Sequence, residues 1–455
     1  MSNLSKTTSR ELLRLALPMM VSQGTFAVMV FTDRWFMAQI DTVHVAAALG
    51  GGVASFFCLS LFMGVITYAN ALVAQYHGAG EIHKCPRVIT QGFLMAIACA
   101  PLLILIALYG AEAFAHLGHD PAQVPLEQVY FQVLMAGGVL TLVKALLACY
   151  FAGISRTRVV MIADVLGMVL NIPLSWALIF GHAGLPQMGI AGAALGTIVA
   201  SGFSIGVFLL FYCNRVHAEQ FHVRASLVLD RGILRRYLRL GAPSGLESFM
   251  NTATFNLYLL LFQSYGVAQG AAMAIVFNWD MLNFIPMIGL NIGVMTLIGR
   301  FVGAGDMERT NQVIAAGFLF GLGYAGVLAV AFYVFRVSLV DVFQTPDGQF
   351  QPVSELATYM MIGLSSYVLA DAVLLVCSGV LRGAGDTRWV MVASVSVHWL
   401  MLLVQYLVIV VFELGPRVSW WVFVYMLISL AVLYTLRLRS GVWRRPERLA
   451  RVMAE

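Results

Sequence analysis

Charged residues are scarce in this sequence: only 11 % of its 455 residues are Asp, Glu, Lys or Arg, whereas 60 % are hydrophobic. Soluble domains carry about 25 % charged residues, so a soluble fold is excluded. The sequence also lacks the G-x-x-x-x-G-K-[ST] pattern of a nucleotide-binding loop, which argues against an ATP-driven protein. Spans of about 20 apolar residues recur instead, without the alternation of barrel strands. The chain is therefore predicted to be an all-α polytopic membrane protein.

The apolar spans predict twelve transmembrane helices. We place them at 12–38, 46–75, 88–110, 127–152, 159–181, 188–213, 236–264, 268–299, 312–335, 355–381, 389–412 and 418–438. The N-terminal segment runs into the first span without a small-residue cleavage site, so we expect a retained helix and not a signal peptide.

Lys and Arg residues predict the topology. When twelve spans are threaded in order, the basic segments fall on one side of the membrane, and Arg336 and Arg417 are the clear exceptions. Because cytoplasmic loops carry the excess of Lys and Arg, both termini are expected in the cytoplasm of a bacterial inner membrane. This topology also accounts for the net charge of +5, so no nucleic-acid partner is expected.

Three sequence echoes reveal an internal repeat. RLALPMMVSQG matches RLGAPSGLESF, with Pro18 and Pro243 225 positions apart, and HGAGE matches VGAGD at the same offset. YFAGISRTRVVM matches VLRGAGDTRWVM at an offset of 230. Six helices per copy is an even number, so the two bundles form a parallel repeat, an architecture of transporters that alternate access between two halves. The predicted segments are an N-terminal lobe 1–213, a basic linker 214–235, a C-terminal lobe 236–440 and a basic tail 441–455.

The motifs LRGAGDTR, GISRTR, LNIPLSWALIFG and MGIAGAALGTIVA, with the repeated GAGD/GAGE loops and ELLRLALP, resemble the multidrug and toxic compound extrusion (MATE) family, in particular its NorM-type bacterial branch. The resemblance covers essentially the whole chain. It implies a secondary antiporter, not an enzyme, that exports cationic drugs or metabolites in exchange for H⁺ or Na⁺. We expect a monomer without a cofactor, and no metal beyond Na⁺ at the coupling carboxylates.

Two other functions remain open from the sequence. A lipid or polysaccharide flippase of the same superfamily would commonly have two further helices and a more basic cavity, and neither is evident. A membrane-embedded transferase would need converging acid, base or metal-binding residues. The His and Asp residues of this chain are dispersed instead.

Two carboxylates deep in the C-terminal half are the main candidates for ion coupling. Glu247 lies eight residues beyond Arg239, roughly 12 Å into the membrane, and Asp371 lies eleven residues before Arg382, roughly 17 Å deep. Two carboxylates that share a low-dielectric site cannot both be ionised cheaply, so one is expected to hold a proton or a cation. The resemblance implies the same role for Glu247 and Asp371.

Polar stripes on two helices predict a substrate cavity. Asn251 and Tyr258 follow Glu247 at helical spacing, and Asp280 begins a second stripe that continues with Asn283. We expect these residues to line the cavity, with Asp280 attracting cationic substrates.

In the N-terminal half, the resemblance places a second cation site at Asp33 and Asn171. Arg34 and Lys144 add fixed positive charges there, which would compete with a bound cation. The alternative is a structural network of Asp33, Asp164 and Lys144.

The polar turn CSGVLRGAGDTR, at 377–388, is expected at the cytoplasmic side. Its Asp386 would cap the next helix or pair locally. His398, alone in an apolar helix, is expected to be a packing residue.

Overall fold

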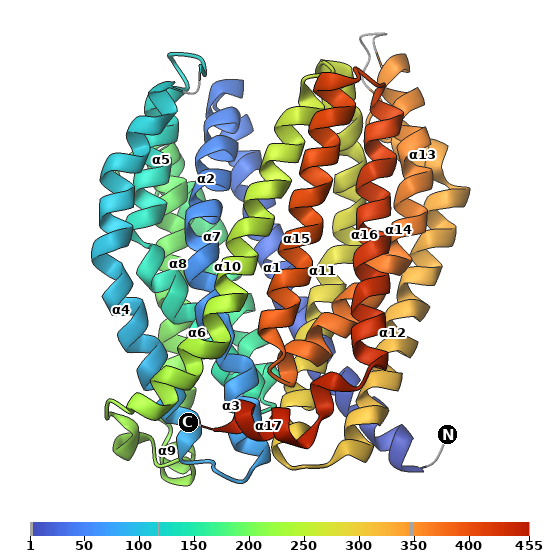
Figure 1. The fold of residues 1–455 in the computed structure, drawn as a ribbon. Coiled ribbons are helices and arrows are strands. Elements are labelled where there is room, and N and C mark those ends of the chain that lie inside the picture. Colours follow the sequence, from blue (N-terminus) through green and yellow to red (C-terminus); the bar gives the residue numbers. More distant parts are fainter. Residues whose placement is uncertain (1–2, 117, 345–349, 455) are drawn as a thin grey trace. The chain divides into compact units, whose positions relative to one another are not determined.

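The computed structural model describes residues 3–116, 118–344 and 350–454, in which helices are joined by short turns (Figure 1). In chain order the elements are α1 (Asn3–Ala38), α2 (Thr42–Thr67), α3 (Ala69–Gly78), α4 (Lys84–Gly110), η1 (Ala111–His116), α5 (Val124–Ala136), α6 (Gly138–Gly153), α7 (Thr157–Phe180), α8 (Ile190–Tyr212), α9 (Arg215–Gln220), η2 (Val223–Ser226), α10 (Arg231–Gln263), α11 (Val267–Gly303), α12 (Met307–Val334), α13 (Arg336–Asp341), α14 (Gln351–Gly383), α15 (Thr387–Tyr406), η3 (Leu407–Val411), α16 (Pro416–Arg439), η4 (Val442–Arg444) and α17 (Pro446–Met453).

Each of the twelve predicted spans coincides with one helix or one interrupted helix. Within the described ranges, ten helices are long and apolar enough to cross a membrane, and α5 with α6, bent by 47°, makes an eleventh. The remaining predicted span, 236–264, corresponds to α10, which is long enough but carries arginines and amides that lower its hydropathy. The predicted all-α, multi-pass fold class is confirmed.

Contacts group the chain into two compact units. The N-terminal unit comprises Val21–Phe249, and the C-terminal unit comprises residues up to Met20 together with Met250–Ala454. The boundaries therefore fall inside α1 and α10, the helices that contain the repeated Pro18 and Pro243. Because proline interrupts the helical hydrogen bonds, it allows one helix to contribute to two units.

These units differ from the predicted lobes 1–213 and 236–440 at their edges. The start of α1 groups with the C-terminal unit, and the start of α10 groups with the N-terminal unit. The predicted linker 214–235 contains α9, η2 and the first turn of α10, and the predicted tail contains η4 and α17.

Each unit contains a close contact made by a glycine, and the two contacts are related by the 225-residue offset of the sequence repeat. In the N-terminal unit, a methyl group at Gly64 of α2 would lie 2.6 Å from the Cα of Gly245 of α10. In the C-terminal unit, one at Gly289 of α11 would lie 2.6 Å from the backbone N of Met20 of α1. Gly289 is Gly64 shifted by 225 positions, and Gly245 is Met20 shifted by the same number. Each unit thus contains the same close helix crossing, which only a residue without a side chain permits.

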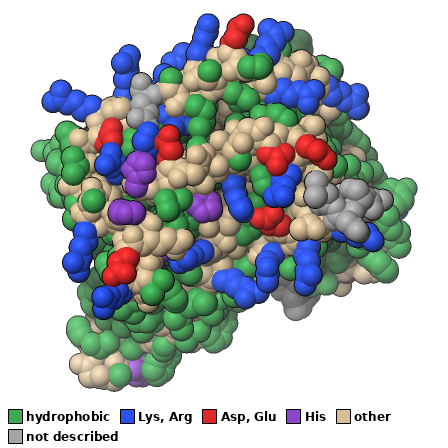
Figure 2. Space-filling view, turned by 90° about the horizontal axis from the view of Figure 1, so that it is seen from below, with side chains coloured by type: hydrophobic (Ala, Val, Ile, Leu, Met, Phe, Trp, Pro, Cys, Tyr) green, Lys and Arg blue, Asp and Glu red, His purple; other side chains and the backbone are tan. Residues whose placement is uncertain are grey.

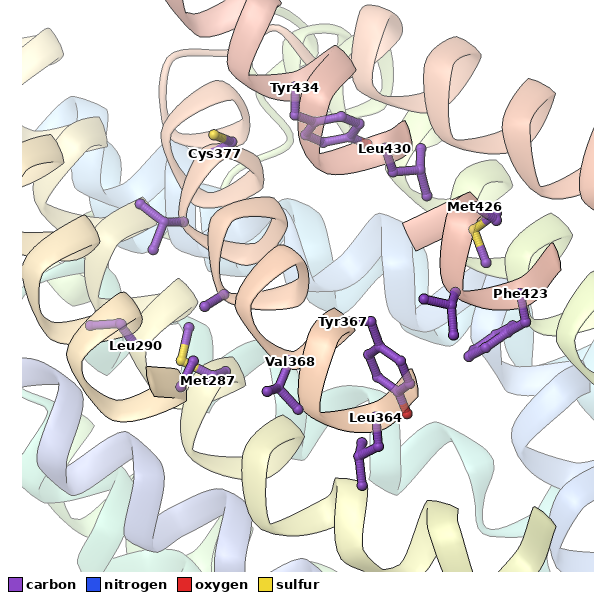
Figure 3. Packing of buried hydrophobic residues seen from close by; sticks show 14 of the residues in the cluster. Met287, Leu290, Leu364, Tyr367, Val368, Cys377, Phe423, Met426, Leu430 and Tyr434 are labelled. Carbon is purple, nitrogen blue, oxygen red and sulfur yellow. The ribbon is translucent and has the colours of Figure 1, made fainter. Parts of the chain in front are cut away.

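The helix α14 forms the centre of the C-terminal unit, where it packs against α11, α12 and α16. Figure 3 shows Leu364, Tyr367 and Val368 of α14 among residues of α11 and α16 in the buried hydrophobic cluster. Side chains on the buried faces of α14 are therefore enclosed by three other helices.

The core of the N-terminal unit contains a smaller cluster formed by α1, α2, α5, α7 and α8. The helices α7 and α8 pack closely, since a methyl group at Gly192 or Gly196 of α8 would lie within 3 Å of atoms of α7.

Asp386 joins the turn 383–387 to the C-terminal tail. Its side chain does not cap α15. Its carboxylate accepts a hydrogen bond from Arg437 Nε at 2.8 Å and another from Arg448 Nη2 at 2.5 Å. Both predicted roles, capping and local pairing, were therefore wrong, because the partners lie 51 and 62 positions along the chain. Figure 2 shows many Lys and Arg side chains, in blue, on the face of the molecule seen from below.

Candidate functional site

Asp371 lies in the middle of α14 and is 7 % exposed. Asn283, on the facing α11, donates a hydrogen bond from Nδ2 to Asp371 Oδ2 at 3.0 Å. Both residues are buried in the C-terminal unit, and the Asn283 amide is a direct partner of the carboxylate. The sequence assigned Asp371 to coupling and Asn283 to the substrate cavity, and the structure brings the two into contact.

Asp280 lies one turn before Asn283 on α11, on the same side of the helix. Its carboxylate is near enough to Asp371 for the two charges to interact, and the Tyr367 hydroxyl of α14 lies beside it. Within the described residues, Asp280 Oδ1 and Asn283 Oδ1 have no hydrogen-bond partner although both atoms are buried. Two acidic side chains and two unpartnered acceptor oxygens thus converge in one apolar unit, an arrangement that is costly without a proton or a cation.

Two other predicted cavity residues lie in the second half of α10. Asn251 Nδ2 donates to Ser394 Oγ of α15 at 2.7 Å, and His398 contacts the backbone oxygen of Ser394. Tyr258 is fully buried and stacks on Phe423 at 5.1 Å. The polar stripe of α10 therefore faces α15 and α16.

Glu247 is buried, with 3 % of its surface exposed. It belongs to the part of α10 in the N-terminal unit, whereas Asp371 belongs to the C-terminal unit. The shared site of these two carboxylates therefore remains a prediction.

The N-terminal candidates form a second polar cluster. Asp33 of α1 accepts a hydrogen bond from Thr197 Oγ1 of α8 at 3.1 Å, and Ser175 of α7 lies beside the same carboxylate. Asn171 Nδ2 donates to Ser175 Oγ at 3.2 Å. Ser175 therefore connects Asp33 to Asn171. Gly196 makes room for this serine, since a methyl group there would lie 2.4 Å from Ser175 Oγ.

The expected network of Asp33, Asp164 and Lys144 is not formed as one cluster. Lys144 Nζ lies 2.9 Å from Asp164 Oδ1, and Ser22 donates a hydrogen bond to the other oxygen of Asp164. Asp33 has different partners, because it lies eleven residues, roughly 16 Å, beyond Ser22 on α1. Arg34 is exposed while Asp33 is buried, since adjacent helical residues point in different directions.

Two participants were missed by the sequence interpretation. Tyr367 precedes Asp371 by four residues on α14, so helical spacing contained a signal for it. Thr197 had no such signal, because it meets Asp33 from another helix. Within the described residues, no group of three His, Cys, Asp or Glu side chains is arranged to hold a metal ion.

Comparison with known proteins decides the family. The MatE family model matches two segments, 18–177 and 243–407. The chain belongs to the MATE family. The matched segments of this MATE protein begin at Pro18 and Pro243, which are related by the repeat. Members of the family are transporters, not enzymes, and couple to H⁺ or Na⁺.

Relatives and solved structures agree with this assignment. The multidrug resistance protein MdtK of Yersinia enterocolitica is 27 % identical over 448 residues, covering 95 % of each chain. MdtK of Yersinia pseudotuberculosis is 26 % identical over 447 residues, again covering 95 % of each.

Among solved structures, a MOP superfamily transporter from Pyrococcus furiosus has a TM-score of 0.86 at 18 % identity, covering 96 % of this chain and 97 % of that one. A MATE protein in complex with MaL6 has a TM-score of 0.85 at 18 % identity, covering 98 % and 100 %. These similarities establish the MATE fold over nearly the whole chain.

Proposed function

We propose that this MATE protein is a secondary active multidrug efflux antiporter that exports lipophilic organic cations in exchange for H⁺ or Na⁺. The observation that carries the proposal is the acidic cluster of Asp371, Asp280 and Asn283 inside the C-terminal unit. Family membership and MdtK relatives that are named multidrug resistance proteins support it.

The cluster supplies a physical basis for coupling. Two carboxylates within electrostatic reach in an apolar interior repel each other, and a proton or Na⁺ relieves that repulsion. Asn283 holds Asp371 in place through its Nδ2 group, which leaves the other carboxylate oxygen available to the ion. An organic cation relieves the same repulsion, so ion and substrate compete for the carboxylates. Competition of this kind, combined with alternating access, gives antiport.

Glu247 would be a second coupling carboxylate, and Asp33 with Asn171 a weaker site in the N-terminal unit. Asp33 accepts a hydrogen bond from Thr197 and lies beside Ser175, and no second acid acts on it among the described contacts. Asn251 and Tyr258 would contribute to the cavity that receives the substrate.

The proposed topology places both termini in the cytoplasm of a bacterial inner membrane, with the protein acting as a monomer. Movement of one charge through 100 mV releases about 2.3 kcal/mol, which sustains roughly a 50-fold concentration gradient. An ion gradient is therefore a sufficient energy source.

Transport in proteoliposomes tests this function. A fluorescent organic cation is loaded, and Na⁺ and pH gradients are imposed separately at zero membrane potential. We expect one of the two inward ion gradients to accelerate efflux of the cation. Equal efflux with and without either gradient would contradict an ion-coupled antiporter.

A further inference from the structure

A surface pocket lies at one end of the C-terminal unit, between α13, α14 and α16. It has a volume of about 480 Å³. Its polar lining comprises Arg336, Ser354, Glu355, Thr358, Tyr359 and Arg417. The helices α14 and α16 begin at this end, and their last residues lead to the Asp386 turn and to the tail, so the pocket lies far from both. Figure 1 shows α13 and α17 at opposite ends of the helices.

The two arginines are unusual at this end. Arg336 and Arg417 were the clear exceptions when Lys and Arg residues were assigned to one side of the membrane. Loops on the other side of a membrane are depleted of such residues, so two of them in one pocket call for a specific role. Within the described residues, neither guanidinium forms a salt bridge.

Aromatic rings hold both guanidinium groups. Arg417 lies over the ring of Tyr359 at 4.7 Å. Arg336 lies over Tyr333 at 4.9 Å and donates one hydrogen bond to the backbone oxygen of that residue. Stacking fixes the plane of a guanidinium and leaves its N–H groups free to donate at the edge. Two such groups in one pocket favour a phosphate, which arginine binds through paired hydrogen bonds.

Glu355 makes a purely anionic ligand unfavourable. Its carboxylate lines the same pocket, and it would repel a second negative group. A ligand that combines a phosphate with a nearby ammonium group satisfies the two arginines and the glutamate together. The hydroxyls of Ser354 and Thr358 add donors for the remaining phosphate oxygens.

The surroundings of the pocket suit a lipid. Tyr359 accepts a hydrogen bond from Trp421 Nε1 at 2.8 Å, and Trp and Tyr are enriched where membrane helices meet the headgroup region. Beside the two arginines, Phe335 is 58 % exposed and Val418 is 44 % exposed. Apolar surface next to a polar pocket matches acyl chains attached to a headgroup.

We propose that this pocket binds the phosphoethanolamine headgroup of a zwitterionic phospholipid. Arg336 and Arg417 bind the phosphate, Glu355 binds the ammonium group, and the acyl chains follow the exposed apolar residues. This site is separate from the acidic cluster and does not depend on the proposed transport function.

Thermal unfolding of the delipidated, detergent-solubilised full chain tests the proposal. Phosphatidylethanolamine, phosphatidylglycerol with the same acyl chains, phosphoethanolamine and inorganic phosphate are added separately. We expect phosphatidylethanolamine to raise the unfolding midpoint more than phosphatidylglycerol does, because a ligand of the folded state stabilises it. Equal shifts from the two lipids would overturn the proposal. A shift from free phosphoethanolamine as large as that from the lipid would overturn the lipid assignment and point to a soluble phosphate ester.

Variants assign the effect to the pocket. In Arg336→Gln/Arg417→Gln the shift caused by phosphatidylethanolamine should be lost, whereas Arg444→Gln, an exposed arginine of η4, should retain it. Glu355→Gln should bind both lipids but lose the preference for phosphatidylethanolamine, which provides a readout even if the double variant does not fold. A preserved shift in the double variant, or a preserved preference in Glu355→Gln, would contradict the site.

Discussion

His217 is a buried histidine outside the membrane-spanning helices. It lies in α9 and is 3 % exposed. Arg156 Nη1 lies 3.0 Å from its Nδ1, and Tyr150 Oη lies 2.9 Å from its Nε2. A guanidinium can only donate, so Nδ1 must be the acceptor and the ring must be neutral. Burial, together with the charge of Arg156, lowers the pKa of His217 from 6.5 to about 4.

This pKa predicts a stability that falls in mild acid. In the unfolded chain the histidine binds a proton near pH 6.5, whereas the folded protein resists protonation until about pH 4. The unfolded state therefore binds more protons between these values, and the stabilisation present above pH 6.5 is lost as the pH falls towards 4. The contribution of His217 to stability is measured by comparing the unfolding midpoints of the wild type and His217→Gln at pH 7.5, 6 and 5.

We expect the difference between the wild type and His217→Gln to shrink or reverse as the pH falls. His116→Gln serves as the control, since His116 is exposed in η1. Parallel pH curves for the wild type and His217→Gln would contradict the assignment.

The sequence draws attention to single polar residues but does not predict their contacts. Asp371, Asp280 and Asn283 were identified because a charge or amide within an apolar span is conspicuous. Their mutual contact could not be predicted, because it depends on how α11 and α14 are rotated against each other. Thr197 was missed for the same reason: a hydroxyl in an apolar helix carries no signal until the facing helix supplies Asp33.

At the scale of helices, the most sharply defined feature is the pair of close helix crossings at Gly64 and Gly289. Gly64 of α2 and Gly289 of α11 each lie against the backbone of the first helix of a repeat. A side chain at either position must displace backbone atoms and not the flexible end of a side chain. The two positions are equivalent under the repeat, so they should respond alike.

We predict that Gly64→Ala and Gly289→Ala each destabilise the protein by about 1–3 kcal/mol, the range for overpacking a well-packed interior. Gly323→Ala is the matched control, because this glycine of α12 has nothing within 4 Å of the added methyl group. Removal of its backbone freedom should stabilise α12 by about 0.5–1 kcal/mol. The free energy of unfolding is measured in detergent for all three variants. An equal change in that free energy in all three would refute the role of the helix crossings.

Helix positions were largely predictable, but interruptions and unit boundaries were not. Each predicted span has its counterpart, since long apolar runs specify membrane helices directly. The bend at Gly137, between α5 and α6, lies inside a continuous apolar run and has no proline to mark it. The lobes 1–213 and 236–440 stay a prediction, whereas the boundaries of the two compact units, which follow from packing, fall inside α1 and α10.

At the scale of the whole molecule, the repeat relates the two units to one mechanism. Both units contain a carboxylate that meets a polar side chain of a neighbouring helix: Asp371 with Asn283, and Asp33 with Thr197. Among the described contacts, only the C-terminal unit has a second acid, Asp280, within electrostatic reach of that carboxylate. We propose on this ground that ion coupling depends mainly on the acidic residues of the second repeat.

The central claim is that the acidic residues of the second repeat couple efflux to an ion gradient. Ion-driven efflux of a fluorescent organic cation from proteoliposomes tests it in Asp371→Asn, Glu247→Gln and Asp33→Asn, with Glu308→Gln on the exposed first turn of α12 as the control. We predict that the Asp371→Asn and Glu247→Gln proteins fold normally but lose gradient-driven efflux. The Asp33→Asn protein should lose less of this efflux, and the control should keep the wild-type rate. Efflux at the wild-type rate in Asp371→Asn would contradict the account, and equal loss in all three variants would refute the asymmetry between the two repeats.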